Sequence, residues 1–185
     1  MTETGRIIKI VSSRYEVLAA NQERVLCVAM GKLRKAHSPV VGDLVEFERF
    51  ADQNGIQKIL PRKNALVRPS IANVDQAIIV MSCKDPDFST TLIDRLIFSV
   101  CYAGIRPVLC ITKLDLIAEN DAIHEEIQHY IDSGYEVYQS GKGYASEDLI
   151  QALKGNISVL TGQSGAGKTT LHRLLQETMI SWLRL

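Results

Sequence analysis

The stretch from residue 162 to residue 169, Gly-Gln-Ser-Gly-Ala-Gly-Lys-Thr, constrains this chain more than any other. It matches the phosphate-loop pattern G-x-x-x-x-G-K-[ST] at every fixed position. A short apolar run precedes it, and the residues after Thr169 are typical of the first turns of a helix. Glycines let backbone N–H groups surround a phosphate, and a helix N-terminus adds partial positive charge there. The stretch predicts a nucleoside triphosphate site; the alternative is a plain Gly/Ser-rich turn.

The motif assigns roles to individual side chains. In phosphate loops of this pattern the lysine, here Lys168, reaches the β- and γ-phosphates, and the hydroxyl of Thr169 is a Mg²⁺ ligand. The loop does not reveal the base. The predicted nucleotide-binding residues of this stretch are Gly162, Gln163, Ser164, Gly165, Ala166, Gly167, Lys168, Thr169 and Thr170.

A second motif, Thr112-Lys113-Leu114-Asp115, comes directly after an apolar run at residues 107–111. It resembles the guanine-recognition pattern [N/T]-K-x-D, with threonine in place of the commoner asparagine. Guanine presents two adjacent donors, N1–H and the 2-amino group, and the carboxylate of Asp115 can accept from both. The stem of Lys113 would lie over the base and cross toward the phosphate loop. Alone the motif is weak, but beside a phosphate loop it predicts guanine.

A third motif, Ser140-Gly141-Lys142, follows a short predicted strand at residues 135–138. It resembles a short motif whose backbone N–H meets O6 of guanine. Three small or basic residues are unspecific on their own. Their position supports the interpretation, because ligands of open α/β sheets bind beyond the carboxyl ends of the strands.

From residue 71 onward, predicted strands alternate with predicted helices. The strands cover 75–81, 107–111, 135–138 and 156–161, and the helices cover 91–103, 121–131 and 146–153. Leu92, Leu96 and Val100 share one face of the first helix, Ser89 or Thr90 could cap its start, and Gly104 suits its end. This order predicts a mainly parallel sheet covered by helices.

Residues 1–62 have a different pattern, which predicts five short strands separated by turn residues. The strands are expected at 5–11, 15–18, 24–29, 42–48 and 55–60. Five short strands in this length predict a small barrel, most simply an OB-fold. A Pro-bounded basic stretch at 63–70 is the expected linker to a second domain at 71–185. Tyr15, Phe47 and Phe50 all fit a core, which argues against base stacking.

Charge is divided unevenly along the chain. Residues 1–70 hold 12 Lys and Arg against 7 Asp and Glu, giving +5, whereas residues 71–185 hold 9 against 14, giving −5. The predicted first domain therefore suits a polyanionic partner, and Lys32, Arg34 and Lys35 are the candidate phosphate-backbone contacts. The alternative for these three is a solvated turn.

Cysteine usage and hydropathy limit the possible locations. Cys27, Cys83, Cys101 and Cys110 form no C-x-x-C pair, and buried free thiols are expected. No apolar run reaches the roughly 18 residues that span a membrane, and no signal-peptide pattern begins the chain. These features predict a cytoplasmic protein.

The order of the motifs narrows the identification. Ordinary GTPases carry the phosphate loop first, but here Thr112-Lys113-Leu114-Asp115 and the 140–142 motif precede it. That order, behind a small barrel, resembles the circularly permuted GTPases of the bacterial ribosome small-subunit-dependent GTPase A family. The resemblance implies GTP hydrolysis stimulated by the 30S subunit, rRNA binding through the OB domain, a role in late 30S maturation, and a C-terminal zinc-binding domain.

The resemblance stops after the phosphate loop. The switch threonine, the D-x-x-G motif and the zinc ligands that the family implies have no counterpart in this sequence, so we expect a truncated member with poor GTP turnover. No residue that positions the attacking water is identified, and no zinc ligand is predicted. Two hypotheses remain: a GTP-binding ribosome biogenesis factor, or a non-catalytic RNA-binding fragment with a vestigial nucleotide site.

Overall fold

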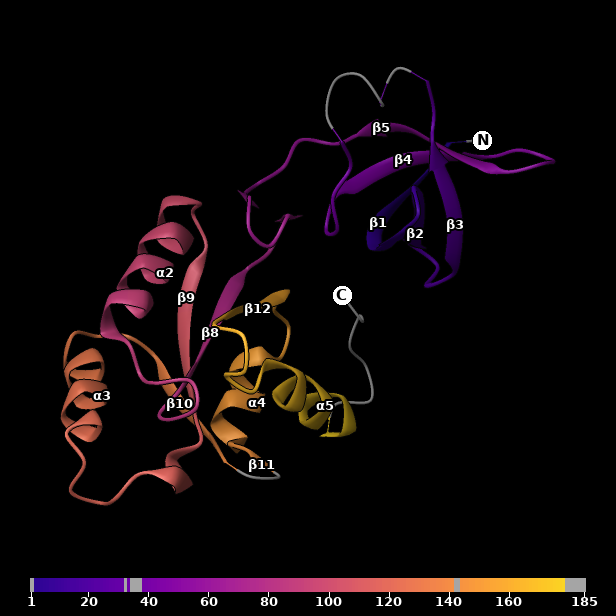
Figure 1. Cartoon of the computed structure of the whole chain (residues 1–185). Helices are drawn as coiled ribbons and strands as arrows, with labels where there is room; N and C mark the ends of the chain where they lie inside the picture. The colour runs from indigo at the N-terminus through magenta and orange to yellow at the C-terminus, as the bar shows by residue number, and fades with distance from the viewer. Residues whose placement is uncertain (1, 32, 34–37, 142–143, 179–185) are drawn as a thin grey trace. The chain divides into compact units, whose positions relative to one another are not determined.

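Alternating apolar and polar residues form five strands in the first part of the chain, as the sequence predicts. The computed structural model describes residues 2–31, 33, 38–141 and 144–178. Its first strands close into a barrel in the order β1-β2-β3-β5-β4, with β4 paired back to β1 (Figure 1). The strands are β1 Thr2–Val11, β2 Arg14–Ala19, β3 Arg24–Ala29, β4 Leu44–Arg49 and β5 Asn54–Ile59. The β3–β5 pair is parallel and the others are antiparallel, which confirms the expected OB-type barrel.

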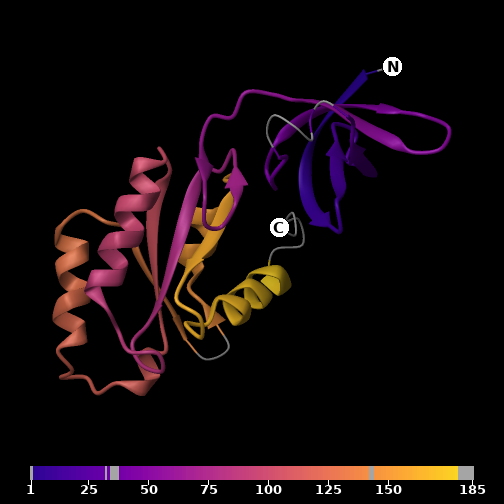
Figure 2. The ribbon, with the colours of Figure 1, turned by 45° about the horizontal axis from the view of Figure 1, so that its top comes forward.

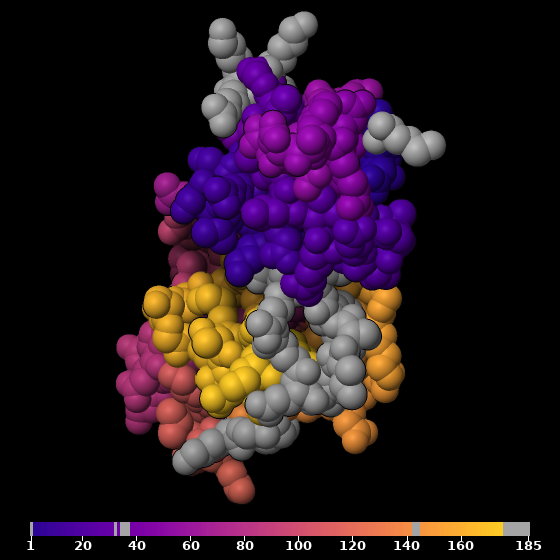
Figure 3. Space-filling model, turned by 90° about the vertical axis from the view of Figure 1, so that its right-hand side faces the viewer, coloured from indigo at the N-terminus to yellow at the C-terminus, as the bar shows by residue number. Residues whose placement is uncertain are grey.

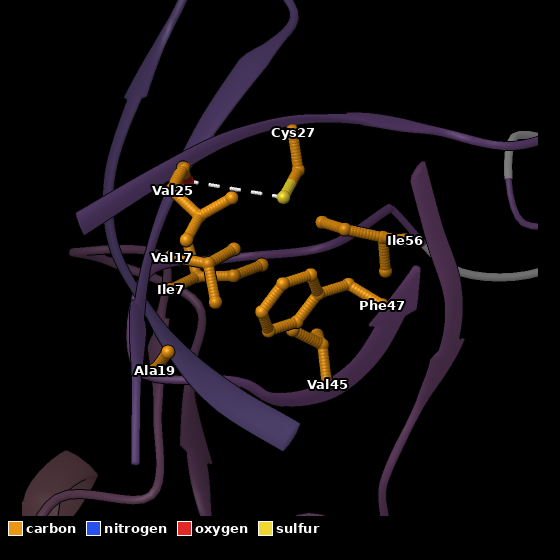
Figure 4. Packing of buried hydrophobic residues seen from close by; sticks show 8 residues of the cluster. All are labelled: Ile7, Val17, Ala19, Val25, Cys27, Val45, Phe47 and Ile56. Atoms are coloured by element: carbon orange, nitrogen blue, oxygen red, sulfur yellow. Dashed lines mark hydrogen bonds between the residues drawn. The ribbon is translucent and has the colours of Figure 1, made fainter. Parts of the chain in front are cut away.

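The barrel core is filled by alternate residues of these strands. In β4, Val45 and Phe47 are fully buried while their neighbours reach the surface. Figure 4 shows the side chains of this cluster pointing toward one another from separate strands. Its members are Ile7, Val17, Ala19, Val25, Cys27, Val45, Phe47 and Ile56. Removing a buried aromatic ring such as that of Phe47 would cost about 3–5 kcal/mol.

Residues 63–70, predicted to be a linker, belong to the barrel unit. They include β6 Ala65–Leu66, which pairs with β7 Ile71–Ala72 in a short hairpin, and the unit ends at Val74. Asn64 holds Val74 through both its backbone groups, donating to the carbonyl at 2.7 Å and accepting from the N–H at 3.0 Å. Asn73 accepts from Lys63 N at 2.8 Å and donates to the carbonyl of Gly42 at 3.1 Å. These amide side chains order a stretch whose composition is typical of a linker.

The second unit begins at Asp75 and contains a five-stranded sheet in the order β11-β10-β9-β8-β12. All neighbours are parallel except the β10–β11 pair. The strands are β8 Gln76–Ser82, β9 Arg106–Thr112, β10 Val137–Gly141, β11 Tyr144–Ala145 and β12 Ser158–Gly162. Every residue of β8 is buried, as a strand covered on both faces requires.

Helices cover both faces of this sheet: α2 and α3 lie on one face, and α4 and α5 on the other (Figures 1 and 2). They are α2 Thr90–Tyr102, α3 Ile123–Asp132, α4 Glu147–Leu153 and α5 Lys168–Thr178, and a short 3-10 helix, η1, lies at Leu114–Leu116. Figure 3 shows the surface of the chain from the side on which α5 lies. None of the helices in the described ranges is both long and apolar enough to cross a membrane.

Several local predictions differ from the structure. The buried face of α2 consists of Ile93, Ile97 and Val100, so the helix is rotated relative to the face predicted through Leu92 and Leu96. The predicted start and end of α2 are confirmed. The hydroxyl of Ser89 accepts from Leu92 N at 3.3 Å, and Gly104 has a φ of +70° just past the helix.

Two side chains expected inside lie outside. Phe50 is 47% exposed, whereas Phe47 is buried and Tyr15 packs partly against the barrel core. Cys101 is exposed on α2, although Cys27, Cys83 and Cys110 are buried free thiols as expected. Apolar character at both positions did not reveal which face the fold would cover.

Candidate functional site

The carboxyl ends of four parallel strands bring the predicted motifs to one edge of the sheet. Pairing places Ser82 opposite Thr112 and Thr112 opposite Ser140, while Gly162 pairs with Val80. The phosphate loop, the threonine motif and the serine motif therefore begin in the last residues of β12, β9 and β10, at the same edge. That arrangement is the one in which doubly wound sheets bind ligands.

The phosphate loop runs from the end of β12 to the start of α5, and its backbone requires glycine. Gly162 has a φ of +130°, and a Cβ there would lie 2.1 Å from the carbonyl oxygen of Val80. Gly167 has a φ of +93°, also in the region that favours glycine. Ala166 between them is fully buried. A loop shaped in this way at a helix N-terminus fits a phosphate group.

Lys168 folds back onto this loop. Its Nζ donates to the carbonyl oxygens of Gly162 at 2.9 Å and Gln163 at 2.6 Å. A bound phosphate would compete with these carbonyls for the ammonium group. Thr169, at the second position of α5, is exposed. Within the described residues, Oε1 of Gln163 is a buried acceptor without a hydrogen-bond partner.

Thr112 joins the guanine-type motif to the phosphate loop. Its hydroxyl, 5% exposed as a residue, lies 2.7 Å from the carbonyl oxygen of Ala166 and 3.4 Å from that of Met81. The shorter contact has the better hydrogen-bond geometry, so the hydroxyl donates to the carbonyl oxygen of Ala166. A threonine at this position thus reaches the loop directly. The contact spans 54 residues of sequence.

Lys113 and Asp115 lie beyond the end of β9. Lys113 has a φ of +59°, and its Nζ donates to the backbone carbonyl of Asp85. Asp115 is exposed within η1, which leaves its carboxylate accessible to a base. Leu114 is partly buried beside them. The lysine therefore crosses toward the segment that follows β8.

The third motif is described only in part. Ser140 is 4% exposed and Gly141 ends β10, while Lys142 lies outside the described residues. The predicted RNA contacts Lys32, Arg34 and Lys35 also lie outside them. In the part of the chain that the structure describes, no group of three or more His, Cys, Asp or Glu side chains could hold a metal ion.

A segment that the sequence analysis did not single out lies at the same edge. Residues 83–88, which we call the 83–88 loop, connect β8 to α2. Cys83 N donates to the carbonyl of Thr112 at 3.0 Å. Burial, with smaller contributions from the nearby carboxylates of Asp121 and Asp115, raises the pKa of the Cys83 thiol to about 11. The 83–88 loop lies near the site because β8 pairs with β9, and no local sequence pattern reveals that pairing.

Two family descriptions match successive parts of the chain. Residues 59–182 match the family described as RsgA GTPase, and residues 4–56 match the RsgA N-terminal domain. The chain is 43% identical to small ribosomal subunit biogenesis GTPase RsgA 2 of Oceanobacillus iheyensis, over 95% of this chain and 62% of that protein. It is 39% identical to the RsgA of Streptococcus pneumoniae, over 90% of this chain and 56% of that protein.

Two solved structures share the fold. YjeQ from Thermotoga maritima superposes with a TM-score of 0.83 at 32% identity, covering 95% of this chain and 65% of that one. YloQ, described as a circularly permuted GTPase, gives a TM-score of 0.78 at 35% identity, covering 97% and 66%. The chain thus spans about 60% of the length of these relatives.

Proposed function

The chain belongs to the RsgA GTPase family, and we propose that it binds guanine nucleotide and acts in biogenesis of the small ribosomal subunit. The nucleotide would bind at the carboxyl ends of β12, β8, β9 and β10. GTP hydrolysis is the proposed reaction, and the cytoplasm is the proposed location. The names of the relatives, which are small ribosomal subunit biogenesis GTPases, support this proposal.

The observation that carries the proposal is the hydrogen bond from Thr112 to the carbonyl of Ala166, 2.7 Å long and buried. It holds a base-recognition motif against a phosphate loop, so one nucleotide could contact both. The glycine-dependent backbone of the loop supports the phosphate half. The exposed carboxylate of Asp115 supports the base half.

Each motif residue has a proposed task. Asp115 accepts from N1–H and the 2-amino group of guanine, Lys113 covers the base, and the backbone at Ser140, Gly141 and Lys142 meets O6. Lys168 exchanges its loop carbonyls for the β- and γ-phosphates. Thr169 would hold Mg²⁺, which would supply charge neutralisation between those phosphates.

The test is nucleotide binding by the purified chain, measured by calorimetry with GTP, GDP and ATP at matched Mg²⁺. We expect GTP and GDP to bind at least about tenfold more tightly than ATP, because losing hydrogen bonds to a charged acceptor costs about 1.5–3 kcal/mol. Equal affinity for ATP and GTP would overturn the guanine assignment. Binding of none of the three would favour the RNA-binding fragment with a vestigial site.

We further propose that the barrel contacts rRNA of the small subunit through Lys32, Arg34 and Lys35. The excess of 12 basic over 7 acidic residues in the first 70 residues supports this, because phosphate contacts depend on Lys and Arg. Changing all three to Ala should weaken 30S association and flatten its dependence on salt. The matched control changes Lys9, Arg14 and Lys58, which are exposed elsewhere on the barrel, to Ala. Equal loss in both triple variants would contradict a specific role for residues 32–35.

A further inference from the structure

Ser82 ends β8 at the site edge, and its side chain is fully buried. Its hydroxyl donates to the carbonyl oxygen of Pro86 at 2.8 Å. Both residues lie outside the three nucleotide motifs. Lys84, Asp85 and Asp87 around them are exposed, whereas Cys83 is buried and Pro86 and Phe88 are partly buried. The Ser82 hydrogen bond fixes the backbone at Pro86 within this largely exposed stretch.

The loop that Ser82 restrains contacts both halves of the nucleotide site. On the base side, the carbonyl of Asp85 accepts from Nζ of Lys113. On the phosphate side, Pro86 lies against the phosphate loop: a Cβ built on Gly165 would be 3.4 Å from Cδ of Pro86. One loop thus lies beside a base-covering lysine and a phosphate-binding backbone.

We propose that Ser82 is a positioning residue for guanine-nucleotide binding, acting through the 83–88 loop on Lys113. By fixing Pro86, it keeps the Asp85 carbonyl where the Lys113 ammonium binds, and this holds the lysine stem across the base site before the nucleotide arrives. The inference rests on the proposed nucleotide-binding function of the same edge. It adds a residue that touches neither base nor phosphate.

The physical reason is preorganisation. A free lysine side chain has many rotamers, and ordering it when a ligand binds lowers affinity. A lysine already held by a backbone carbonyl loses less freedom, provided that the carbonyl itself stays in place. Without the Ser82 hydroxyl, the Pro86 carbonyl loses its donor and the loop gains alternative conformations.

The test compares Ser82→Ala with Ser158→Ala in the full chain. Ser158 starts β12 at the opposite end of the same sheet, where its hydroxyl accepts from Gln76 Nε2 at 2.9 Å. Both changes thus remove one hydroxyl hydrogen bond from this sheet. GDP affinity is measured by calorimetry for each, and for each in a Lys113→Met background, where the stem remains and the ammonium is gone. Hydrogen exchange of peptides covering residues 83–88 and 113–116 is followed without nucleotide.

We expect Ser82→Ala to weaken GDP binding about threefold to tenfold, and by less than about twofold in the Lys113→Met background. Exchange at 83–88 and 113–116 should accelerate, while Ser158→Ala should leave both measurements near wild type. Equal effects of Ser82→Ala with and without the Lys113 ammonium would overturn the inference, because a general loss of stability does not depend on that ammonium. If the unmodified chain binds no GDP, the proposed nucleotide-binding function is wrong. The positioning role is tested separately, because unchanged hydrogen exchange at residues 113–116 in Ser82→Ala would overturn it even without any binding data.

Discussion

Asp43 in the barrel unit and the motif residues of the α/β unit differ in how far their polar groups are enclosed. In the barrel unit, Asp43 is fully buried and accepts from Arg62 at 2.7 and 2.8 Å and from Val40 N at 2.8 Å. In the α/β unit, Lys168 binds only the carbonyls of its own loop in the described contacts, and Asp115 is exposed. The partners of Asp43 are part of the folded structure, because a buried charge is costly unless it is paired and hydrogen-bonded.

Accessible polar groups can bind a ligand, whereas enclosed ones cannot. A carboxylate that is fully buried and accepts three hydrogen bonds, such as Asp43, is not accessible to a ligand. A lysine bonded to nearby backbone carbonyls can exchange those weak acceptors for charged phosphate oxygens. Enclosed polar groups such as Asp43 should therefore affect stability, whereas the accessible polar groups at the α/β site edge should affect nucleotide binding.

The largest expected effect is on binding, at Asp115. Asp115→Asn should cost about 2–4 kcal/mol of GTP binding free energy, because two donors of guanine lose a charged acceptor. The same variant should bind xanthosine triphosphate better than the unmodified chain does, and its melting temperature should change little because the side chain is exposed. Calorimetry with both nucleotides measures this. An unaltered preference for GTP would remove Asp115 from the base site.

The next effect is on stability, at Asp43. Asp43→Ala removes the carboxylate that accepts from Arg62 and from Val40 N. It should lower the free energy of unfolding by about 2–3 kcal/mol, less than for a fully enclosed pair because the Arg62 side chain is 31% exposed. Urea unfolding followed by circular dichroism measures the loss. GDP affinity should stay within about twofold.

The control for Asp43 is a barrel ion pair at the surface. Glu16 and Arg24 are 3.0 Å apart with side chains 24% and 53% exposed. Glu16→Ala should cost less than about 1 kcal/mol. If Asp43→Ala and Glu16→Ala lower the free energy of unfolding by similar amounts, burial of Asp43 does not increase the contribution of its contacts to stability.

A smaller binding effect is expected at Thr112. Thr112→Val keeps the side-chain shape and removes the donor to Ala166, so GDP affinity should fall by about 1 kcal/mol, roughly fivefold. The matched control is Thr4→Val on an exposed position of the barrel. If Thr112→Val binds GDP as tightly as Thr4→Val does, the hydroxyl does not connect the two motifs functionally.

The smallest effect concerns thiol chemistry. Burial raises the pKa of Cys83 and Cys27 to about 11 and of Cys110 to about 12. Because the folded pKa values lie above the unfolded value of 9.0, the buried thiols stabilise the fold fully below pH 9, and that contribution is lost as pH rises toward 11–12. At pH 8, iodoacetamide should modify the exposed Cys101 well before the other three, as measured by peptide mass spectrometry. Early modification of Cys83 would mean that the 83–88 loop opens readily.

Local sequence patterns were enough to predict the two fold classes and to locate the three candidate nucleotide motifs. Strand alternation in residues 2–59 and buried runs before each motif are local patterns, and they gave nearly the correct strands. The motifs could be placed at one edge in advance because the carboxyl ends of parallel strands meet there.

Tertiary structure alone decided which side chains face one another and which face solvent. The Thr112–Ala166 and Ser82–Pro86 hydrogen bonds depend on strand pairing and loop path, and neither has a local signature. Whether Ile93 or Leu92 enters the core depends on which face the sheet covers, since apolar residues occur on more than one side of α2. Hydrophobicity specifies that a residue can be buried; only the arrangement of the packed elements determines that it is.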